Sequence, residues 1–466
     1  MGGVGHRGLL PADINHAGPG RKADAMSSQV ISLLQALIQN TCVNDGTRES
    51  GQEHRSVTTL MEFFGVEGEI FEPAPGRQSL IYRISGTEPG APSLALVPHL
   101  DVVPVDPAGW TQEPFAAEII DGFVFGRGAV DMLNVTAAMA LAVRPYVTGE
   151  LEPRGDLLFV AVADEEAGGR YGASALVEQR WDLVHIDYLL TEVAYPPLSN
   201  ASEPIIPVSI GEKGAFWSIL TASGTPGHGS APYRSDNALR KMVEALHGIF
   251  GSATPVSISP EWANFVSVLA LEDDLKEALI DPDRVDEAID RLAVTDPLFA
   301  RYVHAVTHLT VSPNMLDAGM KANIIADGAT AAVDIRALPG MDRSYVDSYL
   351  FKAMGNARDD IDIASVMDME STISPVENPL WDAIGSSVED LEGHRNLLPT
   401  LMNVGTDARF WRSKGTVAYG VGLFDDRMTF SQMLALFHGH DERVSVESVE
   451  RTTALYEKVL HYFFSP

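Results

Sequence analysis

The chain has 466 residues, enough for two or three domains of ordinary size. Hydrophobic residues make up 45% of it and charged residues 21%, a composition typical of globular proteins that excludes global disorder. The 64 acidic and 33 basic residues give a formal net charge of −31, which disfavours binding to nucleic acids and to anionic membrane surfaces.

Cysteine content and the N-terminal region indicate the compartment. The single cysteine, Cys42, can form neither an intramolecular disulfide nor a thiolate cluster, so a metal would need imidazole and carboxylate ligands. No run of 18 or more apolar residues appears, and residues 1–24 lack the apolar core of a signal peptide. We therefore expect a cytoplasmic protein with a disordered segment at residues 1–26, for which Met26 is an alternative start.

Hydrophobic periodicity predicts that helices alternate with strands in the first part of the chain. An amphipathic helix is expected from Ser27, and a second helix at residues 54–64. Short apolar strands are expected at 93–99, 156–163 and 186–191, with a helix rich in alanine and methionine at 130–143. This alternation predicts an α/β fold in which helices cover both faces of a mostly parallel central sheet.

The pattern changes after residue 207. Expected strands at 208–223 and 329–336, and expected helices at 237–250 and 344–354, indicate an α+β module, to which we also assign the charged helical stretch 269–308. Sheet-like sequence then returns at 404–419. We therefore expect one domain formed by residues 27–207 and 376–466, interrupted by a second domain at 208–375.

Polar residues follow the ends of the expected strands, where open α/β sheets bind their ligands. After the first strand, His99 could ligate a metal while Asp101 accepts the hydrogen bond of its other ring nitrogen. Asp131 follows two glycines, Gly126 and Gly128, which permit a tight turn into a helix. Asp131 therefore either caps that helix or bridges two cations.

Two adjacent acids, Glu165 and Glu166, follow another expected strand. Packing them together is unfavourable unless a cation or a shared proton compensates their charge. Because neighbouring side chains diverge, one of them can ligate a metal while the other faces the reacting water. That division of roles is what hydrolysis with a general base requires.

Together these motifs resemble the M20 family of metallopeptidases and deacylases. The resemblance covers the chain from about residue 28 to the C-terminus. It is carried by His99-Leu100-Asp101, Gly126-Arg127-Gly128-Ala129-Val130-Asp131-Met132, Asp164-Glu165-Glu166, Glu192, Gly227-His228-Gly229-Ser230-Ala231-Pro232 with Asn237, Asn323, Asp334-Ile335-Arg336 with Pro339-Gly340, Gly405-Thr406-Asp407-Ala408-Arg409, and His438 with Asp441-Glu442.

The resemblance implies a zinc-peptidase-like catalytic domain that binds two Zn²⁺ ions per chain, with Co²⁺ or Mn²⁺ as alternatives. One ion would be held by His99 and Glu192, and the other by Glu166 and His438. Asp131 would bridge both ions. The implied ligands are all nitrogen and oxygen donors, which agrees with the scarcity of cysteine.

The resemblance also implies roles in catalysis and substrate binding. Glu165 matches the family's general base, with Asp101 in support of the catalytic site. The domain at 208–375 matches a lid and dimerisation domain, and its His228 matches a histidine that reaches the partner's active site in dimeric relatives. The implied substrate-binding residues are Asn323, Arg336, Gly405 and Thr406, with Arg336 placed to hold a carboxylate through a two-pronged contact.

The chain departs from the common family pattern in two places. Leu133-Asn134 follow Asp131-Met132 where Lys-Gly is usual, and Gly439-His440-Asp441 precede Glu442 where an asparagine is more typical. Neither change removes an expected ligand. His440 is a rival to His438, but the spacing of His438 from Glu442 matches the family and favours His438.

The favoured activity is hydrolysis of a dipeptide or a C-terminal peptide bond beside a free carboxylate. N-acyl-amino-acid deacylation, of the acetylornithine or succinyl-diaminopimelate type, uses the same bond and metals, so the sequence leaves it open. A non-catalytic ligand-binding protein is an alternative of another class, against which the presence of Glu165 argues. The expected partners are a small peptide or N-acyl amino acid and a second copy of the chain bound through the lid, with no nucleic acid and no membrane.

Overall fold

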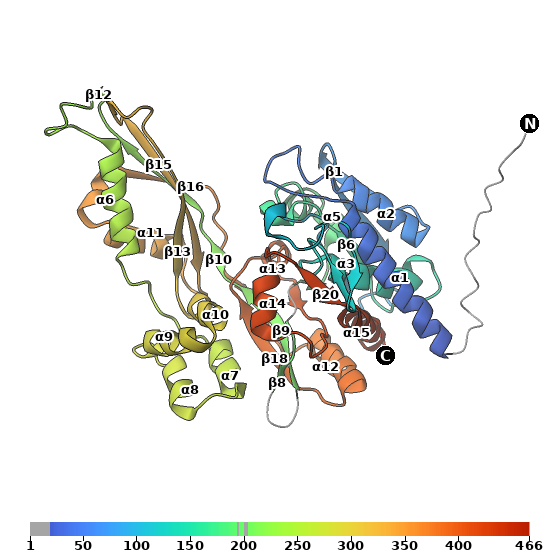
Figure 1. Ribbon diagram of the computed structural model, residues 1–466. Helices are drawn as coiled ribbons and strands as arrows, with labels where there is room; N and C mark the ends of the chain where they lie inside the picture. Colours follow the sequence, from blue (N-terminus) through green and yellow to red (C-terminus); the bar gives the residue numbers. More distant parts are fainter. Residues whose placement is uncertain (1–18, 193–194, 200–203, 466) are drawn as a thin grey trace, which may run out of the picture.

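A computed structural model describes residues 19–192, 195–199 and 204–465. It contains two units (Figure 1). The main unit, residues 19–212 and 371–465, is built from both ends of the chain, and the lid, residues 213–370, is built from its middle. In the described part of the chain, no helix is long and apolar enough to cross a membrane.

The main unit is organised around a ten-stranded sheet in the described part of the chain. Its continuous path runs β1 (Glu69–Ala74), β2 (Arg77–Ile84), β6 (Leu157–Ala161), β3 (Leu94–Leu96), β7 (Tyr188–Thr191), β19 (Val417–Gly420), β9 (Pro204–Glu212) and β17 (Thr372–Ile373), and β8 (Leu198–Ser199) and β18 (Leu397–Met402) also pair with β9. Strands β6, β3, β7 and β19 are mutually parallel, whereas β1, β2 and β17 join in antiparallel pairs. The sheet expected to be mostly parallel is therefore mixed, with a parallel centre.

Helices cover both faces of this sheet because successive residues of its buried strands point to opposite sides. In β6, Leu157 and Phe159 pack against one helical layer, while Leu158 and Val160 pack against the other. The first layer contains α1 (Pro19–Gln39), α2 (His54–Phe64), α3 (Leu133–Val147), α12 (Pro379–Glu392) and α15 (Val446–Phe464). The second contains α4 (Ala173–Gln179), α5 (Trp181–Val184) and α13 (Ala408–Arg412).

The expected helix at residues 54–64 coincides with α2, but the first helix starts earlier than expected. Helix α1 begins at Pro19, so residues 19–26 are helical rather than part of a disordered segment at 1–26. Residues 1–18 lie outside the described residues. A small sheet of β4 (Ile119–Ile120), β5 (Phe123–Phe125) and β20 (Arg443–Ser445), together with α14 (Phe430–Leu436), completes the main unit.

The lid contains an antiparallel sheet with helices on one face only. Its strands are β10 (Gly214–Ala215), β11 (Ser218–Ser223), β13 (Thr310–Ala318), β15 (Gly328–Ala337) and β16 (Ile361–Ser365), and a separate hairpin pairs β12 (Gly227–His228) with β14 (Ile324–Ile325). Helices α6 (Ala238–Phe250) and α11 (Arg343–Met354) pack on the sheet face that turns away from the main unit (Figure 1). Among the described residues, no helix packs on the other face in this way.

Four helices between α6 and β13 bury their apolar surface against the main unit rather than under the lid sheet. They are α7 (Pro260–Val268), α8 (Asp273–Leu279), α9 (Val285–Thr295) and α10 (Pro297–Thr307). Their core includes Tyr302, which packs edge-on against Phe430 of α14, and Trp262. The stretch 269–308, which we assigned to the lid module, therefore shares its core with the main unit.

The chain crosses between the units through two neighbouring strands. The stretch expected as lid strand at 208–223 contains β9, which lies in the main sheet up to Glu212, so the first crossing is at Lys213. The return crossing leads from β16 to β17, which pairs with β9 through Thr372 opposite Glu212. Just inside the lid, the backbones of Ala215 and Met369 exchange two hydrogen bonds of 2.8 and 2.9 Å. The two crossings therefore support each other.

Candidate functional site

The carboxyl ends of the central strands β3, β6 and β7 bring the expected site residues to one edge of the main sheet. His99 follows β3, Glu165 and Glu166 lie in a short helical turn after β6, and Glu192 directly follows β7. Because these strands are parallel neighbours, their ends meet, as sequence patterning predicts for open α/β sheets.

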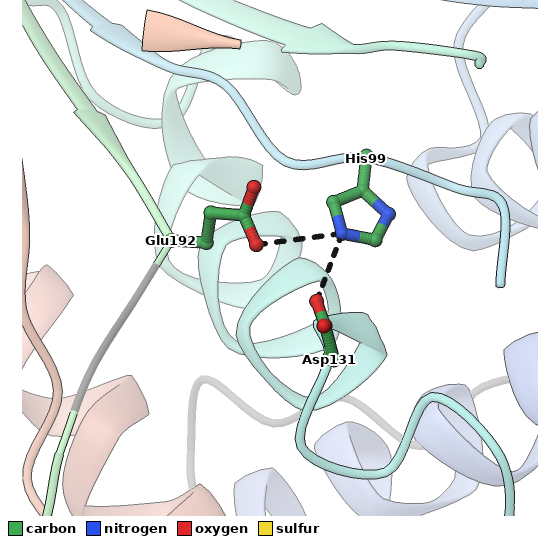
Figure 2. Close-up of side chains that lie close together, drawn as sticks. All are labelled: His99, Asp131 and Glu192. Carbon is green, nitrogen blue, oxygen red and sulfur yellow. Dashed lines mark hydrogen bonds and ion pairs between the residues drawn. The ribbon is translucent and has the colours of Figure 1, made fainter. Parts of the chain in front are cut away.

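One group of potential metal ligands surrounds the buried His99 ring (Figure 2). His99 Nε2 lies 3.2 Å from Asp131 Oδ1 and 3.5 Å from Glu192 Oε2. The other ring nitrogen, Nδ1, lies 3.0 Å from the carbonyl oxygen of Asp101 and can donate to it. In the neutral ring, that hydrogen bond places the proton on Nδ1 and leaves Nε2 as a donor of electrons directed at the two carboxylates, which is the arrangement of a histidine metal ligand.

A second group uses the other oxygen of Asp131. His438 Nε2 lies 3.2 Å from Asp131 Oδ2 and 3.1 Å from Glu166 Oε2. Asp131 thus belongs to both groups and is the one residue placed to bridge two cations. His440, the rival of His438, is in neither group of the described residues; its ring lies instead against Gly109.

The site concentrates negative charge that needs compensation. Burial, together with the charge of Glu192, raises the pKa of Glu165 well above its ordinary value. Burial also raises the pKa of Glu192 to about 8 and that of Glu166 above its usual range. Glu166 Oε1 is buried and has no hydrogen-bond partner among the described residues. Carboxylate and imidazole donors with an unpartnered oxygen suit divalent cations such as zinc, so the residues present fit the implied metals.

Asp101 acts differently from the expected orienting carboxylate. Its backbone carbonyl, rather than its side chain, meets His99, whose Nδ1 is 3.7 Å from the nearest Asp101 carboxylate oxygen. The carboxylate instead accepts hydrogen bonds of 3.1 Å from the backbone N–H groups of both Glu165 and Glu166. Asp101 therefore fixes the turn that presents the candidate base, Glu165, and a candidate ligand, Glu166.

Glu442 holds the segment that carries Asp131, a role that sequence reasoning did not assign. This buried carboxylate accepts hydrogen bonds from the backbone N–H groups of Gly128, Val130 and Asp131 at 2.8–3.1 Å. It also pairs with Arg127 at 2.7 Å. Both side chains lie within the motifs quoted above, so their positions in the sequence were visible, but their pairing was not.

A second buried network supports the Glu165 turn from the N-terminal part of the chain. Arg77 lies 3.0 Å from Glu53 and pairs with Asp164, which also accepts a 3.1 Å hydrogen bond from Asn44. Asn44 donates a further 2.8 Å hydrogen bond to Asp101. No motif marks Arg77, Glu53 or Asn44, and only their joint burial in the structure identifies them.

Arg336 and Gly405 lie near Arg409, which is the neighbour of the general-base candidate, and Thr406 follows Gly405 in the chain. Arg336 Nη1 is 3.8 Å from the position that a Cβ atom on Gly405 would occupy, and Arg409 Nη1 is 2.9 Å from that position. Arg409 Nη1 in turn lies 4.0 Å from Glu165 Oε1. The backbone N–H of Thr406 donates to Glu212 at the lid crossing. These contacts place the expected substrate loop between the lid and the reaction centre.

His228 and Asn323 are not brought to the metal ligands of their own chain. His228 lies on β12, at the tip of the lid far from the main unit (Figure 1), where it is exposed and contacts Ser230 at 2.7 Å. Asn323 lies next to it: its carbonyl accepts a 2.8 Å hydrogen bond from Gly229. The two residues form one exposed pair that is separate from the Arg336 region.

Comparison with known proteins identifies the family. Residues 95–462 match the sequence model of peptidase family M20/M25/M40. The chain belongs to the M20 peptidase family. Among curated proteins, the N-fatty-acyl-amino acid synthase/hydrolase PM20D1 of Homo sapiens is 26% identical over 413 residues, covering 85% of this chain and 78% of that protein. Aminoacylase-1 of Sus scrofa is 25% identical over 402 residues, covering 85% and 86%.

Solved structures of M20 proteins share the fold. An M20 family metallo-carboxypeptidase from Sulfolobus solfataricus matches with a TM-score of 0.69 at 17% identity, covering 94% of this chain and 99% of that chain. A di-peptidase from Saccharomyces cerevisiae gives a TM-score of 0.68 at 16% identity, covering 96% and 98%. The expected M20 membership and α/β fold are therefore confirmed, and with them the assignment to a family of amide-bond hydrolases.

Proposed function

We propose that this M20 protein is a two-metal hydrolase of small substrates in which an amide bond joins an acyl group to an amino acid with a free carboxylate. One observation carries the proposal: Asp131 contributes one oxygen to each of two ligand groups, while Glu165 stands beside them without belonging to either. A shared carboxylate and a neighbouring free acid are the components of hydrolysis with a metal-activated water.

The side chains divide the chemistry between them. Two divalent cations, when bound, polarise the substrate carbonyl and lower the pKa of water. Glu165 takes a proton from the attacking water and returns it to the nitrogen of the leaving amine. Burial keeps the pKa of Glu165 well above that of a solvated carboxylate, so that the protonated form is accessible for the second transfer.

Arg336 is the proposed anchor for the substrate carboxylate. Its Nε and Nη2 atoms lie 2.8 and 3.3 Å from the two carboxylate oxygens of Asp334, which fixes the plane of the guanidinium. Nη1 remains directed toward Gly405 and the reaction centre. A held, planar guanidinium of this kind is suited to recognise a carboxylate.

The exposed pair His228 and Asn323 supports a homodimer in which the lid tip of one chain completes the site of the other. Both residues are presented at the end of the lid hairpin, away from the metal ligands of their own chain. In this arrangement a partner's His228 would donate to the developing charge on the substrate oxygen. Sedimentation velocity would test the dimer.

N-acyl-amino-acid deacylation is a second candidate beside dipeptidase or carboxypeptidase activity. The observation in its favour is that two curated relatives matched over most of this chain are named as an N-fatty-acyl-amino acid synthase/hydrolase and an aminoacylase. Both reactions release an amino acid with a free carboxylate. A panel of dipeptides beside N-acetyl and N-succinyl amino acids would distinguish them.

The decisive experiment combines metal analysis with a substitution of the base. The purified chain is expected to bind two divalent cations and to hydrolyse members of the panel. Glu165→Gln should lower kcat by about 10²–10⁴-fold with metal content unchanged. The matched control is Glu178→Gln, which alters an exposed acid on α4 and should leave turnover intact. Equal turnover by the Glu165→Gln and wild-type proteins would contradict the assigned base.

A further inference from the structure

An apolar cavity of about 350 Å³ lies on the helix-free face of the lid sheet. Residues of β11 and β15 alternate between the two faces, so Leu220 and Ala331 enter the core beneath α6 and α11. Their neighbours Ile219 and Ala332 face the cavity and are paired across the two strands. The cavity walls are Trp217, Met315, Val366 and Asp334.

The cavity adjoins the proposed carboxylate anchor. The guanidinium of Arg336 lies over the Trp217 ring, 5.6 Å from its centroid. Arg336 and Ala332 are on the same strand and the same face, because residues four apart in a strand point to one side. From Gly405 toward the lid, Arg336 therefore comes first, then Trp217, then the cavity.

A second contact ties the cavity to the catalytic loop. The backbone N–H of Val366 donates a 2.8 Å hydrogen bond to the carbonyl of Trp217. Next to it, Met367 Cε lies 2.9 Å from the position that a Cβ atom on Gly168 would occupy. Gly168 ends the helical turn that contains Glu165 and Glu166. Neighbours of the cavity wall therefore contact the site at two points, Met367 at the Glu165 turn and Arg336 at Gly405.

The cavity is lined mainly by apolar groups, beside Ser218, Asn314 and Asp334, and two of its large apolar side chains are exposed to solvent. Met315 is 71% exposed and Val366 is 62% exposed, although each belongs to or adjoins a strand of an ordered sheet. Apolar side chains clustered in a concave surface gain free energy when an apolar ligand covers them. The single charged group on the wall, Asp334, is already paired with Arg336.

We infer that this cavity is the subsite for a large apolar side chain on the amino acid whose carboxylate Arg336 binds. The inference rests on the proposed function and specifies its substrate class as dipeptides or N-acyl amino acids that end in residues such as leucine, methionine or phenylalanine. The cavity neighbours the carboxylate anchor. In an amino acid, the carboxylate and the side chain are both attached to the α-carbon, so the side chain lies close to the group that Arg336 holds.

Filling the cavity tests the assignment. Ala332→Trp places an indole on its floor, between Ile219 and Met315, which both pair with Ala332. The matched control is Thr330→Trp, two residues along the same strand and face, outside the cavity. The measured quantity is the ratio of kcat/KM for N-acetyl-Phe to that for N-acetyl-Gly.

In the wild-type protein this ratio is expected to be at least about ten, since even one methylene in an apolar pocket gives about tenfold or more discrimination. Ala332→Trp should reduce the ratio about tenfold while kcat/KM for N-acetyl-Gly stays within twofold, and Thr330→Trp should leave the ratio unchanged. Met315→Asp, at an exposed position that tolerates a charge, should lower the ratio in the same direction.

An unchanged ratio in both Ala332→Trp and Met315→Asp would overturn the inference. The inference would also be overturned if Ala332→Trp lowered kcat/KM only for N-octanoyl-Gly, relative to N-acetyl-Gly. The cavity would then hold the acyl group. Dissociation constants of N-acetyl-Phe and N-acetyl-Gly, measured by calorimetry on the metal-loaded protein, separate the two proposals. If no amide is hydrolysed, the proposed function fails. If, in addition, Ala332→Trp leaves the ratio of the Kd for N-acetyl-Gly to the Kd for N-acetyl-Phe unchanged, the subsite is overturned as well.

Discussion

The candidate metal centre and the proposed substrate-binding face of the lid hold their side chains in different ways. The Asp131 segment and the Glu165 turn are partly buried and are held by two buried carboxylates, Glu442 and Asp101, that accept hydrogen bonds from backbone N–H groups. On the lid, His228 is exposed, its ring contacts Ser230, and its backbone pairs with Ile324 in the β12–β14 hairpin. Both ligand groups of the first region come from one chain, whereas His228 lies at the lid tip, away from those groups (Figure 1).

This difference has an electrostatic cause. Packing several carboxylates in one buried site is unfavourable, so the backbone around them must be held firmly until cations compensate their charge. A surface that admits and releases substrate has the opposite requirement, because it must remain accessible. Substitutions that loosen the first region should therefore affect metal binding, and substitutions in the second should affect substrate binding alone.

The largest effect that separates the regions is expected from Glu442→Gln. The change keeps the size of the side chain but removes the charge that pairs with Arg127 and attracts three backbone N–H groups toward the Asp131 segment. Loss of such a supporting group typically weakens metal affinity by about 10–100-fold. Competition with a chelator measures this, with the exposed Glu447→Gln as control. Unaltered metal affinity in Glu442→Gln would show that the Asp131 segment keeps its conformation without the Glu442 charge.

A smaller effect, confined to substrate, is expected from Arg336→Lys. Lysine keeps the positive charge but loses the planar fork, so KM should rise about tenfold while kcat and metal content change little. A substrate whose carboxylate is amidated should be hydrolysed equally poorly by the wild-type and Arg336→Lys proteins. Arg343→Lys, which alters a lid arginine paired with Asp347, is the matched control. A fall in metal content instead would place Arg336 in the support of the metal centre.

The smallest effect concerns Lys213, which lies between the two regions. Its buried ammonium donates to the carbonyl oxygens of Ala305 and His308. Burial is the main cause that lowers the pKa of Lys213 to about 7, and repulsion from the positive charge of Arg336 is the second. The unfolded chain then binds more protons than the folded chain above pH 7, so this group makes stability rise with pH toward its ordinary pKa.

Lys213→Met should remove that rise, so the gain in unfolding free energy between pH 7 and pH 9 should be smaller by on the order of 2 kcal/mol. Urea unfolding at the two pH values measures the difference, with the exposed Lys352→Met as control. Identical pH dependence in wild-type and Lys213→Met proteins would contradict a depressed pKa. Hydrolysis at pH 7 by the folded variant should remain close to the wild-type rate.

The positions of three candidate ligands could be predicted from the sequence because each follows a recognisable strand, whereas His438 and the bridging role of Asp131 rest on the family resemblance. His99, Glu166 and Glu192 needed only local periodicity and the rule that parallel strands end at one edge. Glu442 supports Asp131 from 311 positions away, and no local pattern encodes such a pairing. Arg77 was missed for the same reason: its partner Asp164 is 87 positions distant.

The lid shows another limit of sequence patterns. Amphipathic periodicity identified helical sequence at 269–308, but it does not say which surface the apolar side receives, and Tyr302 packs against Phe430 of the main unit. Likewise, the sequence of an apolar strand such as β9 is compatible with either unit. The first boundary between the units was therefore predicted before Glu212, whereas the structure has it after Glu212. Pairing partners, rather than composition, decide both cases.

The paired crossings at Lys213 and Met369 mean that the chain enters and leaves the lid at one spot. Closely spaced ends allow one domain to be inserted into another without breaking the host's sheet. A lid of another length or lining can therefore be exchanged at these positions only together with the main-unit side chains that share a core with residues 260–307, such as Phe430, while the order of candidate ligands in the host is untouched. Selectivity could then diversify between related enzymes while the chemistry of bond cleavage is inherited unchanged.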